Sequence, residues 1–364
     1  MSGLNTAFYI VSSSKISIVR ENGEIVEAQA PVIVSASRRT DIPAFYSDWF
    51  FHRLKVGYSA WTNPFNGAKL FVSYCNTRFI VFWSKNPRPL LDHLSELRER
   101  GIGCYIQYTL NDYEKEGLEK GVRPFEERIE TFKLLVNELG LGNVIWRFDP
   151  LILTDDIDID CLISKVQSIG DKLKGYAKKL VFSFADILSY RKVKSNLEAS
   201  GVPYHEWTEQ EMKTFAERLV KMNKERGWNY ELATCGEKGR YEGVLPNHCV
   251  DDELIIRNGF KDTELMRSLK AEVKPMPGPS LFGSTDPLPD NAIDLGNGFY
   301  VVRGDNRDKG QREFCGCMKS KDIGQYNTCI HMCEYCYANT SKSAAAQNYR
   351  CHQENPWGET ITGR

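Results

Sequence analysis

Three of the eleven cysteines in this chain are spaced like the ligands of one metal centre. Cys329 is followed by Cys333 after three residues, and Cys336 follows after two more. Three thiolates at this spacing can surround one face of a cubane cluster, which leaves the fourth iron without a protein ligand. Soft thiolate ligands select iron–sulfur clusters or zinc. The spacing therefore predicts a metal centre with one position open to a small molecule.

Four further cysteines form a second candidate set. Cys235 follows an apolar run, Cys249 lies in the loop after it, and Cys315 and Cys317 come just before the first set. Four thiolates can hold an auxiliary [4Fe–4S] cluster with no open iron, although a tetrahedral zinc site needs the same number. The C-x-C pair is cramped for a zinc ribbon, which favours the cluster. The other candidates are weaker: Cys75, Cys104 and Cys161 are expected in the core, Cys351 has no assigned partner, and His248, His331 and His352 are isolated histidines near loops.

Composition limits the class of protein. The 364 residues are 41% hydrophobic and 26% charged, with a net charge of −1, so no overall field favours DNA or an anionic membrane. No apolar run approaches the roughly 20 residues of a membrane-spanning helix, and the first fifteen residues do not resemble a signal peptide. We expect a cytoplasmic protein, in which cysteines bind metals more often than they form structural disulfides.

Short apolar runs alternate with amphipathic segments along most of the chain. The expected strands are 31–36, 79–84, 103–109, 143–148, 179–184 and 229–234, and the expected helices are 45–55, 87–100, 124–139, 158–174 and 206–226. Buried strands separated by helices of this length indicate an α/β fold with a parallel sheet. The pattern predicts a partial (β/α) barrel of about six strands.

Four regions are expected along the chain. Residues 1–30 form an N-terminal extension with a β-hairpin around Asn22-Gly23, a pair that favours a type I′ turn. Residues 31–270 form the barrel core, and 271–310 form a proline-rich linker or insertion. Residues 311–364 are a cysteine-rich segment that must fold back onto the barrel to share a face with it.

Polar residues follow each of the six expected strands. They are Ser35, Ser37, Arg38, Arg39 and Asp41; Lys85 and Asn86; Thr109, Asn111 and Asp112; Arg147 and Asp149; Ser183 and Asp186; and Thr234, Cys235 and Glu237. In β/α barrels the carboxyl ends of the strands form the active-site face. Turns and helix caps also attract Ser, Asp and Asn, so any single position has an ordinary structural explanation. All six together favour an active face.

The first cysteine set resembles the cluster motif of the radical SAM superfamily, C-x3-C-x2-C with an aromatic residue, here Tyr335, before the last cysteine. The resemblance implies a [4Fe–4S] cluster whose open iron binds S-adenosylmethionine (SAM) and cleaves it reductively to a 5′-deoxyadenosyl radical. That motif normally comes near the start of the barrel, so its position here implies a permuted arrangement. The C-terminal position and the segments 35–43, 82–87, 144–150 and 315–339 resemble the DUF1848 family, which names no substrate.

The segment Trp83-Ser84-Lys85-Asn86 is also similar to SAM-contacting segments of the spore photoproduct lyase group. That resemblance implies that Lys85 reaches the SAM carboxylate, for which a compact ammonium is suited; a surface lysine before a proline-started helix is the ordinary alternative. The expected SAM contacts are Ser37, Arg38, Lys85, Asn86, Asp149 and Tyr335.

Two other functions remain open at this point. One is an electron carrier with closed clusters, like a ferredoxin, although the first set lacks the nearby fourth cysteine of such proteins. The other is a zinc-stabilised module that docks on a protein or on RNA. A radical SAM enzyme would need a reductant such as flavodoxin or ferredoxin. Nucleic acid enters as a substrate only by analogy with the lyase group. Trp61, Trp83, Tyr108 and Trp146 could stack a base or could fill the core.

Overall fold

The computed structural model describes residues 14–63, 66–278, 287–311 and 313–364. The predicted extension 1–30 is thus described only from residue 14, and part of the proline-rich region, 279–286, also lies outside the described residues. No helix in these ranges is long and apolar enough to cross a membrane.

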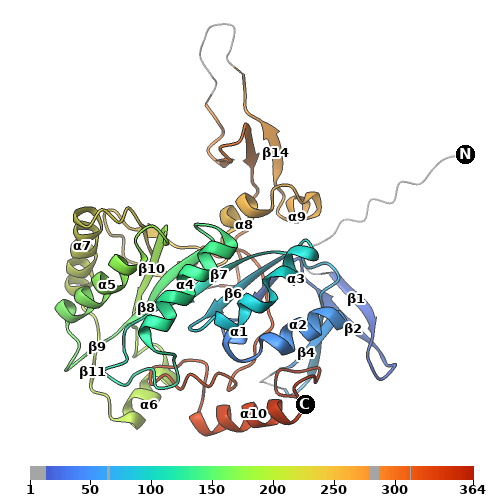
Figure 1. Ribbon diagram of the computed structural model, residues 1–364, viewed down its shortest axis with the longest axis horizontal. Helices are drawn as coiled ribbons and strands as arrows, with labels where there is room; N and C mark the ends of the chain where they lie inside the picture. Colours follow the sequence, from blue (N-terminus) through green and yellow to red (C-terminus); the bar gives the residue numbers. More distant parts are fainter. Residues whose placement is uncertain (1–13, 64–65, 279–286, 312) are drawn as a thin grey trace, which may run out of the picture.

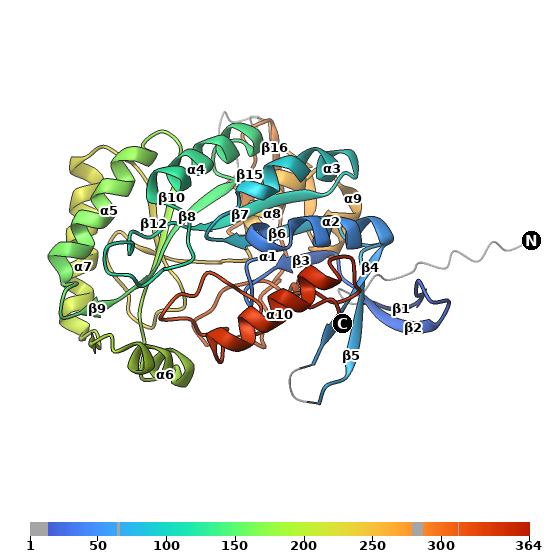
Figure 2. The same cartoon turned by 60° about the horizontal axis from the view of Figure 1, so that its bottom comes forward.

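The molecule is built on one sheet of eight parallel strands (Figures 1 and 2). Its order is β13-β12-β10-β8-β7-β6-β3-β17. The six strands predicted from the sequence are the six central ones: β3 (Ile33–Ala36), β6 (Phe79–Ser84), β7 (Gly103–Thr109), β8 (Val144–Leu151), β10 (Lys179–Phe184) and β12 (Glu231–Thr234). Two short strands, β13 (Leu245–Pro246) and β17 (Lys321–Asp322), form the edges. The edges are not paired with each other, so the described sheet is open and no closed barrel is formed.

Helices follow most strands, as the amphipathic segments predict. They are α1 (Ile42–Phe45), α2 (Ser47–Val56), the 3₁₀ helix η1 (Arg88–His93), α3 (Leu94–Glu99), α4 (Phe125–Leu139), α5 (Ile159–Leu173), α6 (Arg191–Ser200), α7 (Glu209–Glu225), α8 (Asp252–Gly259), α9 (Thr263–Ser268) and α10 (Lys342–Glu354). Several of these helices begin at capping residues. Thr208 and Glu211 form a capping box at the start of α7, and Asp158 caps α5.

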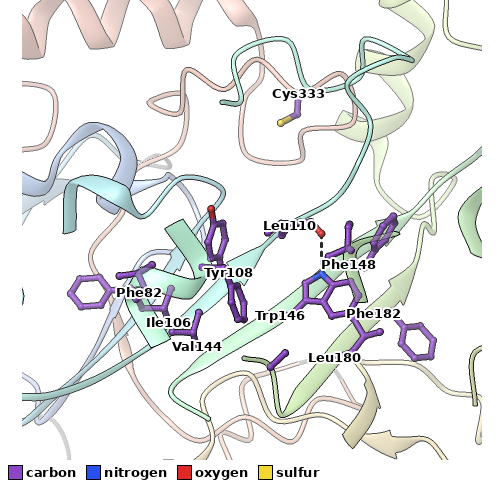
Figure 3. Close-up of a cluster of buried hydrophobic side chains, with 14 of the residues drawn as sticks. Phe82, Ile106, Tyr108, Leu110, Val144, Trp146, Phe148, Leu180, Phe182 and Cys333 are labelled. Atoms are coloured by element: carbon purple, nitrogen blue, oxygen red, sulfur yellow. Dashed lines mark hydrogen bonds between the residues drawn. The ribbon is translucent and has the colours of Figure 1, made fainter. Parts of the chain in front are cut away.

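Alternation of side chains along the strands gives the sheet two buried faces. One face, with Phe82, Tyr108 and Trp146, belongs to the larger core, to which α2, α4, α5 and α7 contribute (Figure 3). The other face, with Tyr105 and Ile145, packs against residues of α8 and α9 and of the cysteine-rich tail. The sheet is therefore covered on both sides, as a parallel sheet requires. Tyr108 and Trp146 have no exposed surface, so they fill the core rather than offer a stacking platform.

The predicted hairpin is present, but its turn is not of type I′. Strands β1 (Ser14–Val19) and β2 (Ile25–Ala30) pair antiparallel and join β5 (Lys69–Ser73) and β4 (Tyr58–Thr62) in a separate four-stranded sheet. A type I′ turn needs positive φ at two positions, and here only Gly23 has it, with φ 85°. The amide of Gly23 donates to Arg20, and the amide of Arg20 donates to Glu24, which defines a three-residue loop with glycine in the left-handed position.

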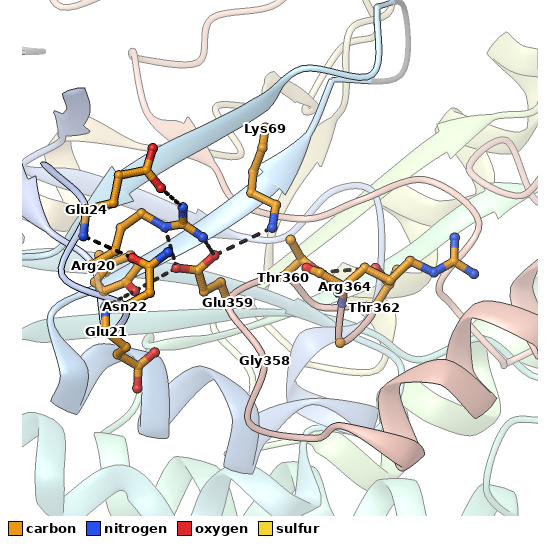
Figure 4. A network of polar contacts seen from close by, with 12 residues as sticks. Arg20, Glu21, Asn22, Glu24, Lys69, Gly358, Glu359, Thr360, Thr362 and Arg364 are labelled. Atoms are coloured by element: carbon orange, nitrogen blue, oxygen red, sulfur yellow. Dashed lines mark hydrogen bonds and ion pairs between the residues drawn. The ribbon is translucent and has the colours of Figure 1, made fainter. Parts of the chain in front are cut away.

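The hairpin is tied to the end of the chain through Glu359 (Figure 4). Arg20 donates two hydrogen bonds to the Glu359 carboxylate, at 2.8 and 2.7 Å, and the Tyr58 hydroxyl donates a third at 2.7 Å. Lys69 adds an ion pair at 3.5 Å. The hydrogen bond from Arg20 lowers the pKa of Glu359 to about 2.

The region predicted as a proline-rich linker carries secondary structure. Strands β14 (Glu272–Pro275), β15 (Ala292–Asp294) and β16 (Phe299–Val302) form an antiparallel sheet with β16 in the middle. The prolines of this region led to the prediction of a linker rather than strands. Pro275 is compatible with a strand because it lies at the end of the edge strand β14. The remaining two-residue strands, β9 (Leu153–Thr154) and β11 (Tyr204–His205), pair with each other.

Candidate metal centres

Polar residues at the carboxyl ends of the central strands contact one another. The Asn111 amide nitrogen donates to the Asp149 carbonyl at 3.2 Å, and the Asp149 amide donates back to Asn111 at 3.0 Å. The Ser183 hydroxyl donates to the Asp149 carboxylate. The ends of β7, β8 and β10 are thus joined by hydrogen bonds, as expected for strands that run in one direction.

The first cysteine set lies on a loop that is held against the residues after β7. The amide of Glu334 donates to the Leu118 carbonyl at 2.9 Å, and the amide of Gly121 donates to the His331 carbonyl at 2.8 Å. The loop therefore extends the strand-end region with thiols at Cys329, Cys333 and Cys336. Burial raises the pKa of Cys333, which lies within electrostatic range of the other two thiols. The structure thus brings the three thiols into one neighbourhood.

His331 is a structural residue of this loop. Its side chain is buried, with Nε2 at 2.7 Å from the Asp41 carboxylate and Nδ1 at 3.2 Å from the Gly121 carbonyl. Asp41 also caps α1 and accepts from the Lys85 amide at 2.7 Å. Both ring nitrogens of His331 are therefore occupied, which removes it from the ligand candidates.

Lys85 lies beside Cys333 in a buried network of charges. Its ammonium donates to Glu119 at 2.6 Å and to the Tyr335 hydroxyl at 2.9 Å. Glu119 also accepts from Tyr335 and lies 3.7 Å from Arg128. Burial opposes ionisation of Glu119, but the two cations outweigh it, and the pKa of this carboxyl falls to about 2. Lys85 therefore contributes a positive charge next to the cysteine loop.

The predicted SAM contacts around Lys85 divide into two groups. Lys85 and Tyr335 lie together and adjoin Cys333, as described above. Asn86, in contrast, lines a surface pocket with Arg88 and Arg123, away from the cysteines. Lys85 and Asn86 are adjacent in the sequence, but their side chains have different neighbours.

The second cysteine set converges on the opposite face of the sheet. The sulfurs of Cys235 and Cys249 are 3.2 Å apart. The Cys317 sulfur accepts from the backbone amides of Cys249 and Val250 at 3.2 and 3.4 Å. Cys315 and Cys317 interact through their side chains. Cys249 is 14 residues from Cys235 and 68 residues from Cys317 in the sequence. The four thiols therefore come from separate parts of the chain and share one location.

Two strands hold this location in place. Tyr105 and Gln107 are two residues apart on β7, so their side chains project from the same face. Both donate to the Cys249 carbonyl, at 2.7 and 2.9 Å. On β8, Arg147 donates to the Cys249 sulfur at 3.2 Å and to Gln107 at 3.1 Å. The loop that carries Cys249 is thus fixed by hydrogen bonds from two neighbouring strands.

Two arginines balance the charge of these thiols. Hydrogen bonding from Cys235 and the guanidinium of Arg147 hold the pKa of Cys249 well below its usual range. Burial opposes the charge of Arg38, but the nearby Cys317 and Cys249 outweigh it and raise the pKa of that guanidinium. Arg38, predicted as a SAM contact, therefore faces the second set.

The remaining predicted contacts lie between the two sets. Asp149 pairs with Arg147, and its carboxylate also accepts from Ser183. The Tyr337 hydroxyl donates to the Arg38 carbonyl, and Tyr337 is 46% exposed although it lies near both Cys336 and Asp149. Ser37 accepts from the Arg39 amide at 3.0 Å. This group connects the two cysteine sets.

The thiols of both cysteine sets are suitable ligands for soft metals such as iron or zinc. The distances between their sulfurs can be compared with those around a single zinc ion. Among the described residues, the group of three ligand atoms within 4.8 Å of one another is His248, Asp251 and Asp252, and no three cysteines meet that limit. Four thiolates around one zinc lie about 3.8 Å apart, given Zn–S bonds of about 2.3 Å. The Cys235 and Cys249 sulfurs, 3.2 Å apart, meet that spacing, whereas no third described cysteine has its sulfur within 4.8 Å of both. His248, Asp251 and Asp252 have structural neighbours instead: Asp251 caps α8, and Asp252 pairs with Arg303.

Sequence reasoning missed Glu119 and Arg128 in the buried network and Asp322 beside Arg38. Asp322 accepts from the Arg38 amide at 2.9 Å. Glu119 lies in a loop with two other glutamates, Glu114 and Glu116, so nothing in the sequence distinguishes it. Only Arg128 carried a signal, as a charged residue at an apolar position of α4.

Comparison with known proteins gives one match. A family model described as a domain of unknown function, DUF1848, matches residues 33–338. No curated protein and no solved structure matches the chain.

Proposed function

The chain belongs to the DUF1848 family, and we propose from its two cysteine sets that it is a radical SAM enzyme with an auxiliary iron–sulfur cluster. The proposed SAM-binding cluster is held by Cys329, Cys333 and Cys336. The auxiliary cluster is held by Cys235, Cys249, Cys315 and Cys317. The observation that carries the proposal is the loop of three thiols over the strand ends, with no fourth cysteine beside it and with Lys85 next to Cys333.

The location supports enzymatic chemistry rather than simple electron transfer. The carboxyl ends of parallel strands position side chains from several elements at one place, as in β/α barrels. We take the open sheet as a partial barrel, which the tail extends by adding β17 beside β3. The cysteine motif thereby reaches the strand ends although it comes late in the chain, which is the permuted arrangement that the resemblance implies.

Bound SAM would be cleaved with one electron to methionine and a 5′-deoxyadenosyl radical, which abstracts hydrogen from the substrate. The protein's own part is to bind and orient. Lys85 offers a positive charge near the open position, but Glu119 and Tyr335 already bind its ammonium. We propose that Lys85 attracts the SAM carboxylate while this network fixes its position.

We propose an auxiliary cluster rather than zinc at the second set. The C-x-C pair of Cys315 and Cys317 is cramped for a zinc ribbon, and Arg38 and Arg147 supply two positive charges against the negative charge of a four-thiolate cluster. Such a centre can pass electrons from a cytoplasmic reductant such as flavodoxin or ferredoxin.

The test is SAM cleavage by anaerobically reconstituted protein. Wild-type protein with dithionite and SAM should release 5′-deoxyadenosine, and Cys333→Ala should lose this activity with an altered absorbance near 400 nm. Cys75→Ala is the matched control because Cys75 is exposed and belongs to neither set. Product yields from Cys333→Ala equal to those from Cys75→Ala would contradict the mechanism. A colourless wild type that contains zinc instead of iron would contradict both clusters.

A further inference from the structure

Five residues near the strand ends form a patch of alternating cations and aromatic rings, which we call the Trp61–Tyr326 patch. Its cations are Arg39, Lys192 and Lys321, and its rings are Trp61 and Tyr326. Arg39 lies 5.8 Å from the Trp61 ring centre and 5.2 Å from that of Tyr326. Lys321 lies 4.8 Å from Trp61, and Lys192 lies 4.6 Å from Tyr326.

The patch assembles residues from four separate parts of the chain. Arg39 follows β3, Trp61 lies near the end of β4, Lys192 is in the first turn of α6, and Lys321 and Tyr326 belong to the tail. Tyr326 precedes Cys329 by three residues, and Arg39 follows Arg38. The patch therefore borders the two centres of the proposed enzyme.

The patch concentrates three positive charges. Within the described ranges none of the three has a carboxylate oxygen within 4.0 Å, although Asp322 lies near Lys321, and the Trp61 indole nitrogen is buried without a hydrogen-bond partner. Burial and the neighbouring Arg39 lower the pKa of Lys321 to about 8, although the adjacent Asp322 acts in the opposite direction. Crowded positive charge of this kind is relieved when an anion binds.

We propose that the Trp61–Tyr326 patch binds a substrate made of flat heterocycles and phosphates, either a single-stranded nucleic acid or a free nucleotide. Cations contact phosphates, and the two rings stack bases, which is the combination found in proteins that bind single strands without sequence preference. The reaction of the bound base rests on the proposed radical SAM function. Binding itself requires neither SAM nor a reduced cluster.

The experiment measures binding by the full-length reconstituted protein. Fluorescence anisotropy with a labelled single-stranded 12-mer should give a salt dependence with a slope of about −2, since three cations each contribute about 0.7. Lys192→Gln, at an exposed position, should reduce that slope by about 0.7. Tyr326→Leu should weaken binding about fivefold or more through lost stacking. Lys133→Gln is the control, because Lys133 lies over Tyr176 on another surface, and it should bind like wild type.

Two competitors identify the ligand. If a mononucleotide displaces the 12-mer as tightly as unlabelled 12-mer does, the substrate is a nucleotide; if it does not, the substrate is the strand. Equal displacement by inorganic polyphosphate would overturn the inference, because stacking would then contribute nothing. So would wild-type-like binding by Lys192→Gln and Tyr326→Leu. Intact binding without deoxyadenosine formation would remove the proposed reaction but leave this site.

Discussion

Arg147 donates a hydrogen bond of 3.2 Å to the sulfur of Cys249, a residue 102 positions later in the chain. The guanidinium is 3% exposed and is also paired with Asp149. A buried cation of this kind needs negative partners, since an isolated charge in the interior is costly. Arg147 thus links the end of β8 to the charge state of the second cysteine set.

Replacing Arg147 by Gln should weaken metal retention at the second set. Hydrogen bonds to charged groups contribute about 2 kcal/mol, so the affinity should fall about 30-fold. Titration with a chelator, followed by iron analysis, measures the loss at this centre. Arg98→Gln serves as the control, because Arg98 is an exposed residue paired with Glu138. Equal chelator resistance in both variants would show that Arg147 has no part in holding the metal.

Glu119→Gln should destabilise the fold, because it leaves Lys85 and Arg128 buried without their anion. Breaking a buried pair from one side costs about 3–5 kcal/mol of unfolding free energy. Urea denaturation of the protein measures the change. Glu138→Gln breaks an exposed pair instead and should cost about 1 kcal/mol or less. A loss of similar size in the two variants would contradict a stabilising role of Glu119 between Lys85 and Arg128.

Stability should fall in acid as Glu359 is protonated. Its pKa is about 2 in the folded chain and near 4.5 when unfolded, because Arg20 binds the folded carboxylate. A carboxyl with a lowered folded pKa stabilises the fold above its unfolded pKa, and this stability is lost as the pH falls from about 5 towards 2. Glu359→Gln should therefore be less stable than wild type at pH 7 and lose less stability on acidification. Parallel pH profiles from thermal melts would refute this role.

The main sheet could be predicted because its signals are local. Six apolar runs with period and length typical of buried strands became the six central strands, and helices formed between them, two of which begin at the capping residues Asp158 and Thr208. The small sheet at β14–β16 escaped prediction because its strands are short and one ends in a proline. The open edges also escaped, since β13 and β17 have two residues each.

The cysteine sets were identified by residue type, but their surroundings were not. Cys235 and Cys317 could be grouped because thiols are rare and chemically distinct. Glu119 could not, because one glutamate among several gains its role only when the chain brings Lys85 and Arg128 beside it. Partners of this kind depend on long-range contacts, which leave no periodic signal in the sequence.

The separation of Cys249 from Cys317 sets the order in which this protein can mature. During synthesis, Cys235 and Cys249 emerge well before the tail that carries Cys315 and Cys317, and β17 pairs with β3 only after almost the whole chain exists. A nascent chain that ends before residue 315 therefore holds half of one ligand set and none of the other. Assembly of the proposed clusters would therefore follow translation of the tail, when the sheet is nearly finished rather than unfolded.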